Sequence, residues 1–123
     1  MNDNAPLLVV VDAANVVGSV PDGWWRDRRG AAERLRDRLA SDGVPEASGP
    51  MEILLVVEGA ARGVESVPGV RVESAPGSGD DHIVEVVAGA AERSVLVVTA
   101  DRELRRRVGE LGADVAGPRT VRP

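Results

Sequence analysis

The chain has 123 residues, which suits one domain and allows about two-thirds of the unfolded surface to be buried. It has no cysteine, which excludes disulfides, thiolate nucleophiles and thiolate zinc sites, so a metal ion would need oxygen ligands or the lone His82. The net charge of -5 argues against a protein that coats nucleic acid through long-range attraction, but it does not exclude a nuclease with a cation-binding acidic centre.

The sequence shows no sign of a membrane segment or of several domains. No apolar stretch approaches the ~18 residues of a membrane-spanning helix, and no basic-then-apolar leader is present. The only linker-like segment, residues 41–50, is too short to separate domains. We therefore expect a cytoplasmic protein without a membrane partner, organised as a single domain over residues 1–123.

Apolar runs and helical patterns alternate from the start of the chain. Leu7 to Val11 is a continuous apolar run ending at Asp12, which is typical of a strand covered on both faces. From Trp24 to Ala40, apolar residues recur at helical spacing among arginines and acids. Asp22 is the expected N-cap of this helix, and Gly43 is its expected stop.

The middle of the chain continues the alternation. The run MEILLVVEG, residues 51–59, predicts a second buried strand, and residues 70–73 predict a shorter third one. A Gly-rich turn then leads into a helix that begins at Asp80 or Asp81 and continues through Ala90.

The last third adds a fourth strand from Ser94, a helix that stops at Gly112, and a short fifth strand around Val115. The strands are too apolar for a sheet with one solvated face, and strands alternate with helices along the chain. This order indicates an α/β fold, a three-layer α/β/α sandwich around a mostly parallel five-stranded sheet.

Acidic residues follow the expected strands. Ligands of open parallel sheets bind outside the carboxyl ends of the strands, so these carboxylates are expected to converge on one edge. Converging carboxylates repel one another unless cations or hydrogen bonds compensate, and oxygen-only clusters suit Mg²⁺ or Mn²⁺. The acids are Asp12 after the first strand, Glu58 after the second, Asp80 and Asp81 after the third, and Asp101 after the fourth.

Each acid also has a purely structural explanation. Asp12 could begin a loop, and Asn15 could cap a turn. Asp80, Asp81 and Asp101 could cap helices, because aspartate is favoured at helix N-termini. The glutamate after the second strand could be a solvated loop residue. Independent caps need not fall at the strand ends that flank one crevice, so together these residues favour a metal site.

Other features are less specific. His82 lies beside the acidic pair, but a histidine without partners is more often a surface or packing residue than a ligand. Trp24 and Trp25 could stack on bases, although we expect at least one of them in the core. The arginine-rich runs 26–30 and 102–107 could contact phosphates or form solvated helix faces. The segment GSGDDH lacks the third glycine of a dinucleotide fingerprint, and a chain without lysine has no Walker-type phosphate loop.

Four segments resemble, in order and spacing, the motif series of the PIN-like nuclease superfamily, particularly its NYN branch with the YacP-like bacterial proteins. The segments are VVVDAANVVG, LLVVEGAARG, GSGDDHIVE and VVTADRELRRRV. The first segment matches a family strand that ends in Asp and is followed by Asn three residues later. The third segment matches an Asp-Asp pair that opens a helix, and the fourth matches a Thr or Ser that precedes the final Asp. The family commonly has aspartate where this chain has Glu58, and often Asp-Gly-Tyr-Asn where this chain has Asp-Ala-Ala-Asn.

This resemblance implies a PIN-like sheet of order 3-2-1-4-5 and an endoribonuclease that depends on Mg²⁺ or Mn²⁺. Water would be the nucleophile, so no nucleophilic side chain is needed. The implied metal ligands are Asp12, either Asp81 or Asp80, Asp101 and Glu58. Glu58 would act together with Glu103 in the outer shell of the metal. Asn15 would orient water or a phosphate oxygen, Thr99 would fix Asp101 and lie near the substrate, and Arg62 and Arg102 would contact phosphates.

Three functions remain open at this stage. The first is a metal-dependent ribonuclease acting on RNA, and the second is a nuclease fold that binds RNA or metal without turnover. The third is a nucleoside triphosphate pyrophosphohydrolase, for which the chain shows neither a Nudix pattern nor a helical EExxE cluster. A homodimer and an antitoxin partner are both compatible with the resemblance.

Overall fold

A computed structural model describes residues 5–45, 47 and 49–121. The ends of the predicted domain, and two residues of the segment 41–50, lie outside the described residues. Five strands form one sheet, all parallel, in the order β3-β2-β1-β4-β5. The predicted fold class and strand order are thereby confirmed. The strands are β1 (Leu7–Asp12), β2 (Met51–Val57), β3 (Val70–Ser74), β4 (Val95–Val98) and β5 (Asp114–Ala116).

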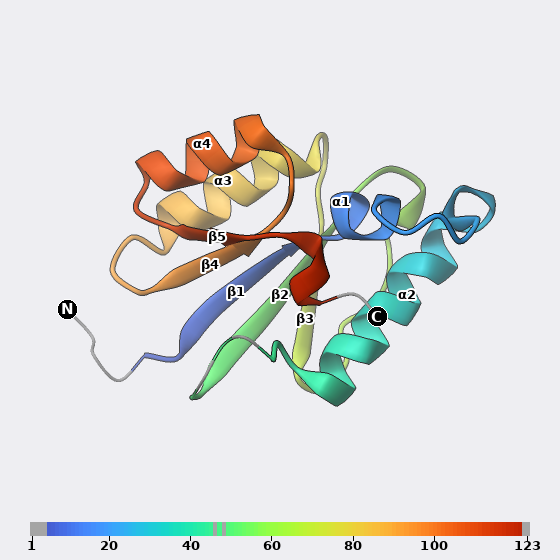
Figure 1. Ribbon diagram of the computed structural model, residues 1–123, viewed down its shortest axis with the longest axis horizontal. Helices are drawn as coiled ribbons and strands as arrows, with labels where there is room; N and C mark the ends of the chain where they lie inside the picture. Colours follow the sequence, from blue (N-terminus) through green and yellow to red (C-terminus); the bar gives the residue numbers. More distant parts are fainter. Residues whose placement is uncertain (1–4, 46, 48, 122–123) are drawn as a thin grey trace.

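Helices cover both faces of the sheet, which makes a three-layer α/β/α sandwich (Figure 1). One face carries α1 (Ala13–Gly18) and α2 (Arg28–Asp42), and the other carries α3 (Gly79–Gly89) and α4 (Arg102–Glu110). Three short 3-10 helices lie in the connections: η1 (Trp24–Arg26), η2 (Gly59–Ala61) and η3 (Pro118–Thr120). None of the helices in the described part of the chain is both long and apolar enough to cross a membrane.

The core has two halves because side chains along a strand alternate between the faces of the sheet. In β1, Val9 and Val11 pack toward α1 and α2, whereas Leu8 and Val10 pack toward α3 and α4. All four are buried. Burial on both faces is why the strands read as continuous apolar runs rather than as alternating patterns.

The helix predicted from Trp24 begins later than expected. Trp24 and Trp25 belong to η1, and α2 starts at Arg28 after its N-cap Asp27, whose carboxylate accepts a hydrogen bond from Gly30 N at 2.9 Å. The prediction that Asp22 caps this helix was therefore wrong. Neither tryptophan is a core residue, because Trp24 is half-buried and Trp25 is 53% exposed.

Two smaller differences concern the starts of other helices. The residues after Asp12 form the short helix α1, where the sequence suggested only a turn. The N-cap of α3 is Ser78, whose hydroxyl accepts from Asp81 N at 3.1 Å. Asp80 and Asp81 therefore lie in the first turn of α3, and neither is its cap.

Candidate functional site

The carboxyl ends of the central strands meet at one edge of the sheet. Asp12 at the end of β1 pairs with Val56 of β2, and the preceding Val11 pairs with Val98 of β4. Glu58 and Thr99 each come directly after the last residue of their strand. Parallel pairing in this register therefore brings Asp12, Glu58 and Thr99 to the same edge.

Asp12 is a buried carboxylate, only 4% exposed, and two hydrogen bonds fix its orientation. The hydroxyl of Thr99, itself fully buried, donates to Asp12 Oδ2 at 3.0 Å. The backbone N–H of Asn15 donates to Asp12 Oδ1 at 3.4 Å, so the carboxylate also caps α1. Buried polar groups that are paired in this way are held in one geometry.

The loop after β4 is tied to α1 and to β1. The backbone N–H of Ala100 donates to Asn15 Oδ1 at 2.8 Å, and that of Asp101 donates to Thr99 Oγ1 at 3.2 Å. The Asp101 carboxylate accepts from Leu104 N at 2.8 Å and so caps α4. Asp101 thus has the capping role that was its structural explanation, and it also lies two residues after the buried Thr99 that holds Asp12.

Negative charge accumulates at this edge. The pKa of Asp12 is raised to about 6. Burial is the largest cause, two hydrogen bonds act against it by lowering the pKa, and the charges of Asp80 and Glu58 also contribute to the rise. Burial also raises the pKa of Asp80, to which the negative charges of Asp101 and Glu58 contribute. We call Asp12, Glu58, Asp80 and Asp101 the acidic edge. None of the four forms a salt bridge with another described residue.

Glu58 reaches the start of α3 and is fixed there. Its Oε2 accepts a hydrogen bond from Gly79 N at 3.0 Å. A Cβ atom at Gly79 would lie 3.0 Å from Glu58 Oε1, closer than side chains normally approach, so the glycine allows this contact. The contact between Glu58 and Gly79 was not predicted, because the two residues lie 21 positions apart and only the fold brings them together.

Of the two adjacent aspartates, only Asp80 belongs to the acidic edge. Asp81, which the sequence suggested as a ligand, is 70% exposed and its Oδ1 accepts from Arg107 Nη1 of α4 at 3.0 Å. Adjacent residues of a helix point about 100° apart, which separates the two carboxylates. His82 also faces elsewhere, because its Nε2 lies 2.7 Å from Glu73 Oε1.

The remaining predicted residues fall into different environments. Thr99, suggested as a substrate contact, is fully buried and acts as a support for Asp12 instead. Arg62 is exposed, and its Nη1 donates to Pro76 O at 3.4 Å. Arg102 is exposed in the first turn of α4 and forms no hydrogen bond or ion pair with another described residue, which leaves its donors open. Glu103 pairs with Arg106 on the outer face of α4.

The chemistry of the acidic edge fits a hard divalent cation. Among the described residues, no three aspartate, glutamate or histidine side chains are close enough to hold a metal ion jointly. Mg²⁺ keeps several water molecules and is commonly bound by only one or two carboxylates. The edge offers oxygen ligands alone, and a cation would relieve their mutual repulsion. Its donor set therefore suits Mg²⁺ or Mn²⁺ bound partly through water.

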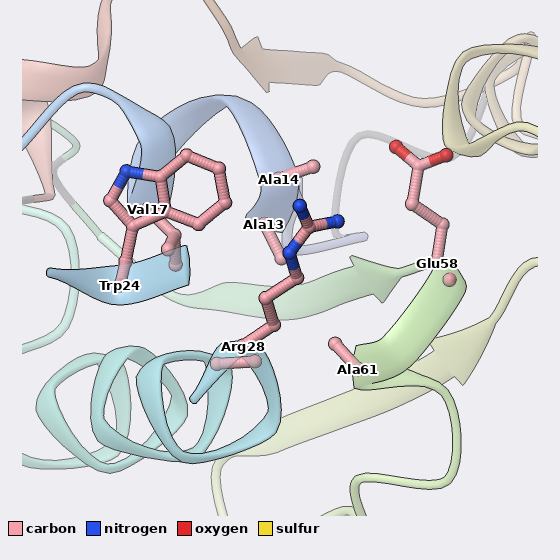
Figure 2. A pocket seen from close by; sticks show the side chains of 9 residues that line it. Ala13, Ala14, Val17, Trp24, Arg28, Glu58 and Ala61 are labelled. Atoms are coloured by element: carbon pink, nitrogen blue, oxygen red, sulfur yellow. The ribbon is translucent and has the colours of Figure 1, made fainter. Parts of the chain in front are cut away.

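A cavity of about 240 Å³ opens beside the acidic edge (Figure 2). Glu58 lines it and thereby joins it to the edge. This cavity was not predictable from the sequence, because its walls come from three separate segments, residues 13–17, 24–32 and 58–61. The other lining residues are Ala13, Ala14 and Val17 of α1, Trp24 of η1, Arg28 and Ala32 of α2, and Gly59 and Ala61 of η2.

Comparisons with known proteins support the fold. No family model and no curated protein matches the chain. Among solved structures, the chain is similar to a point mutant of Rae1 (YacP) from Bacillus subtilis, with a TM-score of 0.66 and 16% sequence identity. The match covers 92% of this chain and 70% of that one. At this identity the likeness concerns the fold, which is PIN-like and is shared with a YacP protein.

Proposed function

We propose that this protein is a metal-dependent ribonuclease that hydrolyses RNA phosphodiester bonds at the acidic edge. The observation that carries the proposal is the buried carboxylate of Asp12, which lies in the field of other acids and forms no compensating salt bridge within the described part of the chain. Such strongly perturbed groups concentrate at functional sites. The motifs similar to PIN-like nucleases and the PIN-like fold are in line with this chemistry.

The proposed ligands are Asp12, Asp80 and Asp101. Since no three acids of the described residues are close enough to hold an ion jointly, at least one of the three would bind through water. When bound there, Mg²⁺ or Mn²⁺ would make a water molecule more acidic and offset negative charge on the attacked phosphate. Asp80 replaces Asp81 in this set because Asp81 pairs with Arg107. Glu58 contributes charge from the side of β2, where its contact with Gly79 fixes it.

Three further residues support or extend this site. Thr99 and Asn15 are positioning residues: the first holds the Asp12 carboxylate and the second holds the backbone just before Asp101. Arg102 follows Asp101 directly, and its open donors suit a phosphate of the RNA strand. The chain thus supplies acids for the cation, an arginine for the RNA strand, and two residues that position the acids.

The test is Mn²⁺ binding by calorimetry together with an RNA cleavage assay. It compares the wild type, the double variant Asp12→Asn/Asp101→Asn, and the control Asp37→Asn/Asp42→Asn, whose exposed aspartates lie in the second half of α2. We expect the first variant to lose both binding and cleavage and the control to keep both. Equal Mn²⁺ binding by all three proteins would overturn the proposal.

Two other results would select the alternatives. Wild-type protein that binds Mn²⁺ and RNA without cleaving RNA is a binding module with a nuclease fold. Release of pyrophosphate from nucleoside triphosphates, without RNA cleavage, identifies a pyrophosphohydrolase. The products of both incubations are resolved by chromatography.

A further inference from the structure

We infer that the cavity beside the acidic edge is a nucleobase subsite, in which one unpaired base of an RNA strand stacks on Trp24 while Arg28 contacts the same nucleotide. The inference rests on the proposed ribonuclease function, because it places the strand that the acidic edge would cleave. We call the cavity and its two polar walls, Trp24 and Arg28, the base pocket.

The indole ring of Trp24 has neighbours on several sides. A Cβ atom on Gly18 would lie 3.7 Å from its Cζ2, so the end of α1 lies next to the ring. The ring of Trp25 stands edge-on to it, with centroids 6.1 Å apart, and the guanidinium carbon of Arg28 lies 5.3 Å from its centroid. These neighbours limit the orientations of the ring, so it loses less conformational entropy when a base stacks on it.

Arg28 brings an uncommitted cation into the same pocket. It is the first residue of α2, and its side chain extends into the cavity that Trp24 and Glu58 also line (Figure 2). It forms no ion pair or hydrogen bond with another described residue, and its one contact of note is the cation–π contact with Trp24. Its planar donors are therefore available to a phosphate or to the carbonyl edge of a base.

The shape and place of the pocket fit a base in a strand. Small side chains at Ala13, Ala14 and Ala61 leave room beside the indole. Ala13 follows Asp12 directly, so a base in the pocket brings the adjoining phosphate toward the acidic edge. A base within a duplex is stacked and paired and cannot enter, which makes single strands and loops the expected substrates.

Variants of two neighbouring residue pairs test this inference. Trp25 and Arg26 form a similar cation–π pair, 5.8 Å from guanidinium carbon to ring centroid, and neither lines the cavity. Affinity for a short single-stranded RNA is measured by fluorescence anisotropy with Ca²⁺ as the cation. We expect Trp24→Leu to weaken binding roughly 5- to 150-fold and Arg28→Gln about tenfold. Arg26→Gln should leave the affinity unchanged, and Trp25→Leu, which removes only an edge contact with Trp24, should weaken binding far less than Trp24→Leu. Circular dichroism confirms that all variants fold.

Tryptophan fluorescence gives an independent readout. The Trp25→Leu variant retains only Trp24, whose emission should be quenched on RNA binding, whereas the Trp24→Leu variant retains Trp25, which should respond weakly. An oligonucleotide with abasic positions should bind Trp24→Leu and wild type alike, because stacking is then absent from both.

The outcomes separate this inference from the function on which it rests. If the wild type cleaves RNA but Trp24→Leu and Trp25→Leu bind RNA equally well, the base pocket is overturned. The ribonuclease proposal then still stands. Wild type that neither binds nor cleaves RNA overturns both. Trp24-dependent binding of ATP without RNA binding assigns the pocket to a free nucleotide and overturns the strand assignment, as does equally tight Trp24-dependent binding of duplex RNA.

Discussion

At the residue scale, the ionised carboxylate of Asp12 destabilises the fold. Its pKa is about 6 in the folded protein against an ordinary value of 3.8, so the folded state binds this proton more tightly than the unfolded chain. The resulting stabilisation is complete below about pH 4 and is lost as the pH rises through 6. The difference corresponds to about 3 kcal/mol between the two ends of this window.

Replacing this carboxylate by a neutral amide should stabilise the protein without metal. We expect Asp12→Asn to raise the free energy of unfolding by about 1 kcal/mol at pH 7.5, less than the full charge effect because the amide NH₂ gains no assured acceptor. The gain should shrink as the pH falls from 6 to 4, where the wild-type carboxyl becomes protonated. Urea denaturation across this range measures it, with Asp37→Asn as control; a gain that does not vary with pH would contradict the assignment.

The hydroxyl of Thr99 should matter for both stability and pH dependence. Thr99→Val keeps the shape but removes the donor to Asp12 and the acceptor for Asp101 N, which should cost about 1–3 kcal/mol. The hydrogen bond lowers the pKa of Asp12, so its loss should move the acid limb of the pH–rate profile to higher pH. Thr99→Ser retains the hydroxyl and should restore that limb. If the acid limb of the pH–rate profile does not move in Thr99→Val, ionisation of Asp12 does not determine that limb.

At the element scale, the three central strands were predictable because burial on both faces leaves a strong apolar signal, whereas helix starts were not. We expected Asp22 to cap this helix, whereas its N-cap is Asp27. The choice depends on Gly23, whose φ of 82° begins the 3-10 turn that separates the tryptophans from α2. The short α1 was missed because six residues carry little periodic signal and its start depends on the cap at Asp12.

The two candidate caps of α2 should differ in their contribution to stability. Asp27→Ala removes the side-chain acceptor of Gly30 N and should lower the free energy of unfolding by about 1 kcal/mol. Asp22→Ala removes no cap and should change it little. Equal effects of the two substitutions in thermal or urea denaturation would contradict the observed helix start.

The candidate site was predictable to the extent that strand ends converge in a parallel sheet. That rule placed Asp12, Glu58 and Asp101 at one edge, but it could not choose between Asp80 and Asp81. Choosing between the two aspartates requires knowing how α3 is rotated about its axis. In the structure, α3 is oriented so that Asp81 pairs with Arg107 of α4. The sequence suggested that Trp24 could stack on bases and that the run 26–30 could contact phosphates. It did not indicate the cavity that joins them, because no spacing along the chain relates α1, η1 and η2.

At the scale of the whole molecule, the acidic edge should couple cation binding to stability. A cation that binds only the folded protein stabilises it by about 2.7 kcal/mol at a concentration 100 times its dissociation constant. We expect Mn²⁺ to raise the melting temperature of the wild type and of Asp37→Asn/Asp42→Asn, but not that of Asp12→Asn/Asp101→Asn. Differential scanning fluorimetry measures these shifts. Identical shifts in all three proteins would indicate binding elsewhere.

The hydrogen bonds from Thr99 to Asp12 and from Ala100 to Asn15 join residues from opposite ends of the sequence. Both depend on the pairing of β1 with β4, so the acidic edge is complete only when β4 lies beside β1. During synthesis, a nascent chain that has not yet exposed Asp101 lacks both supports. The proposed ribonuclease would therefore gain its activity only when most of its chain has left the ribosome, and a shorter fragment released early would have none.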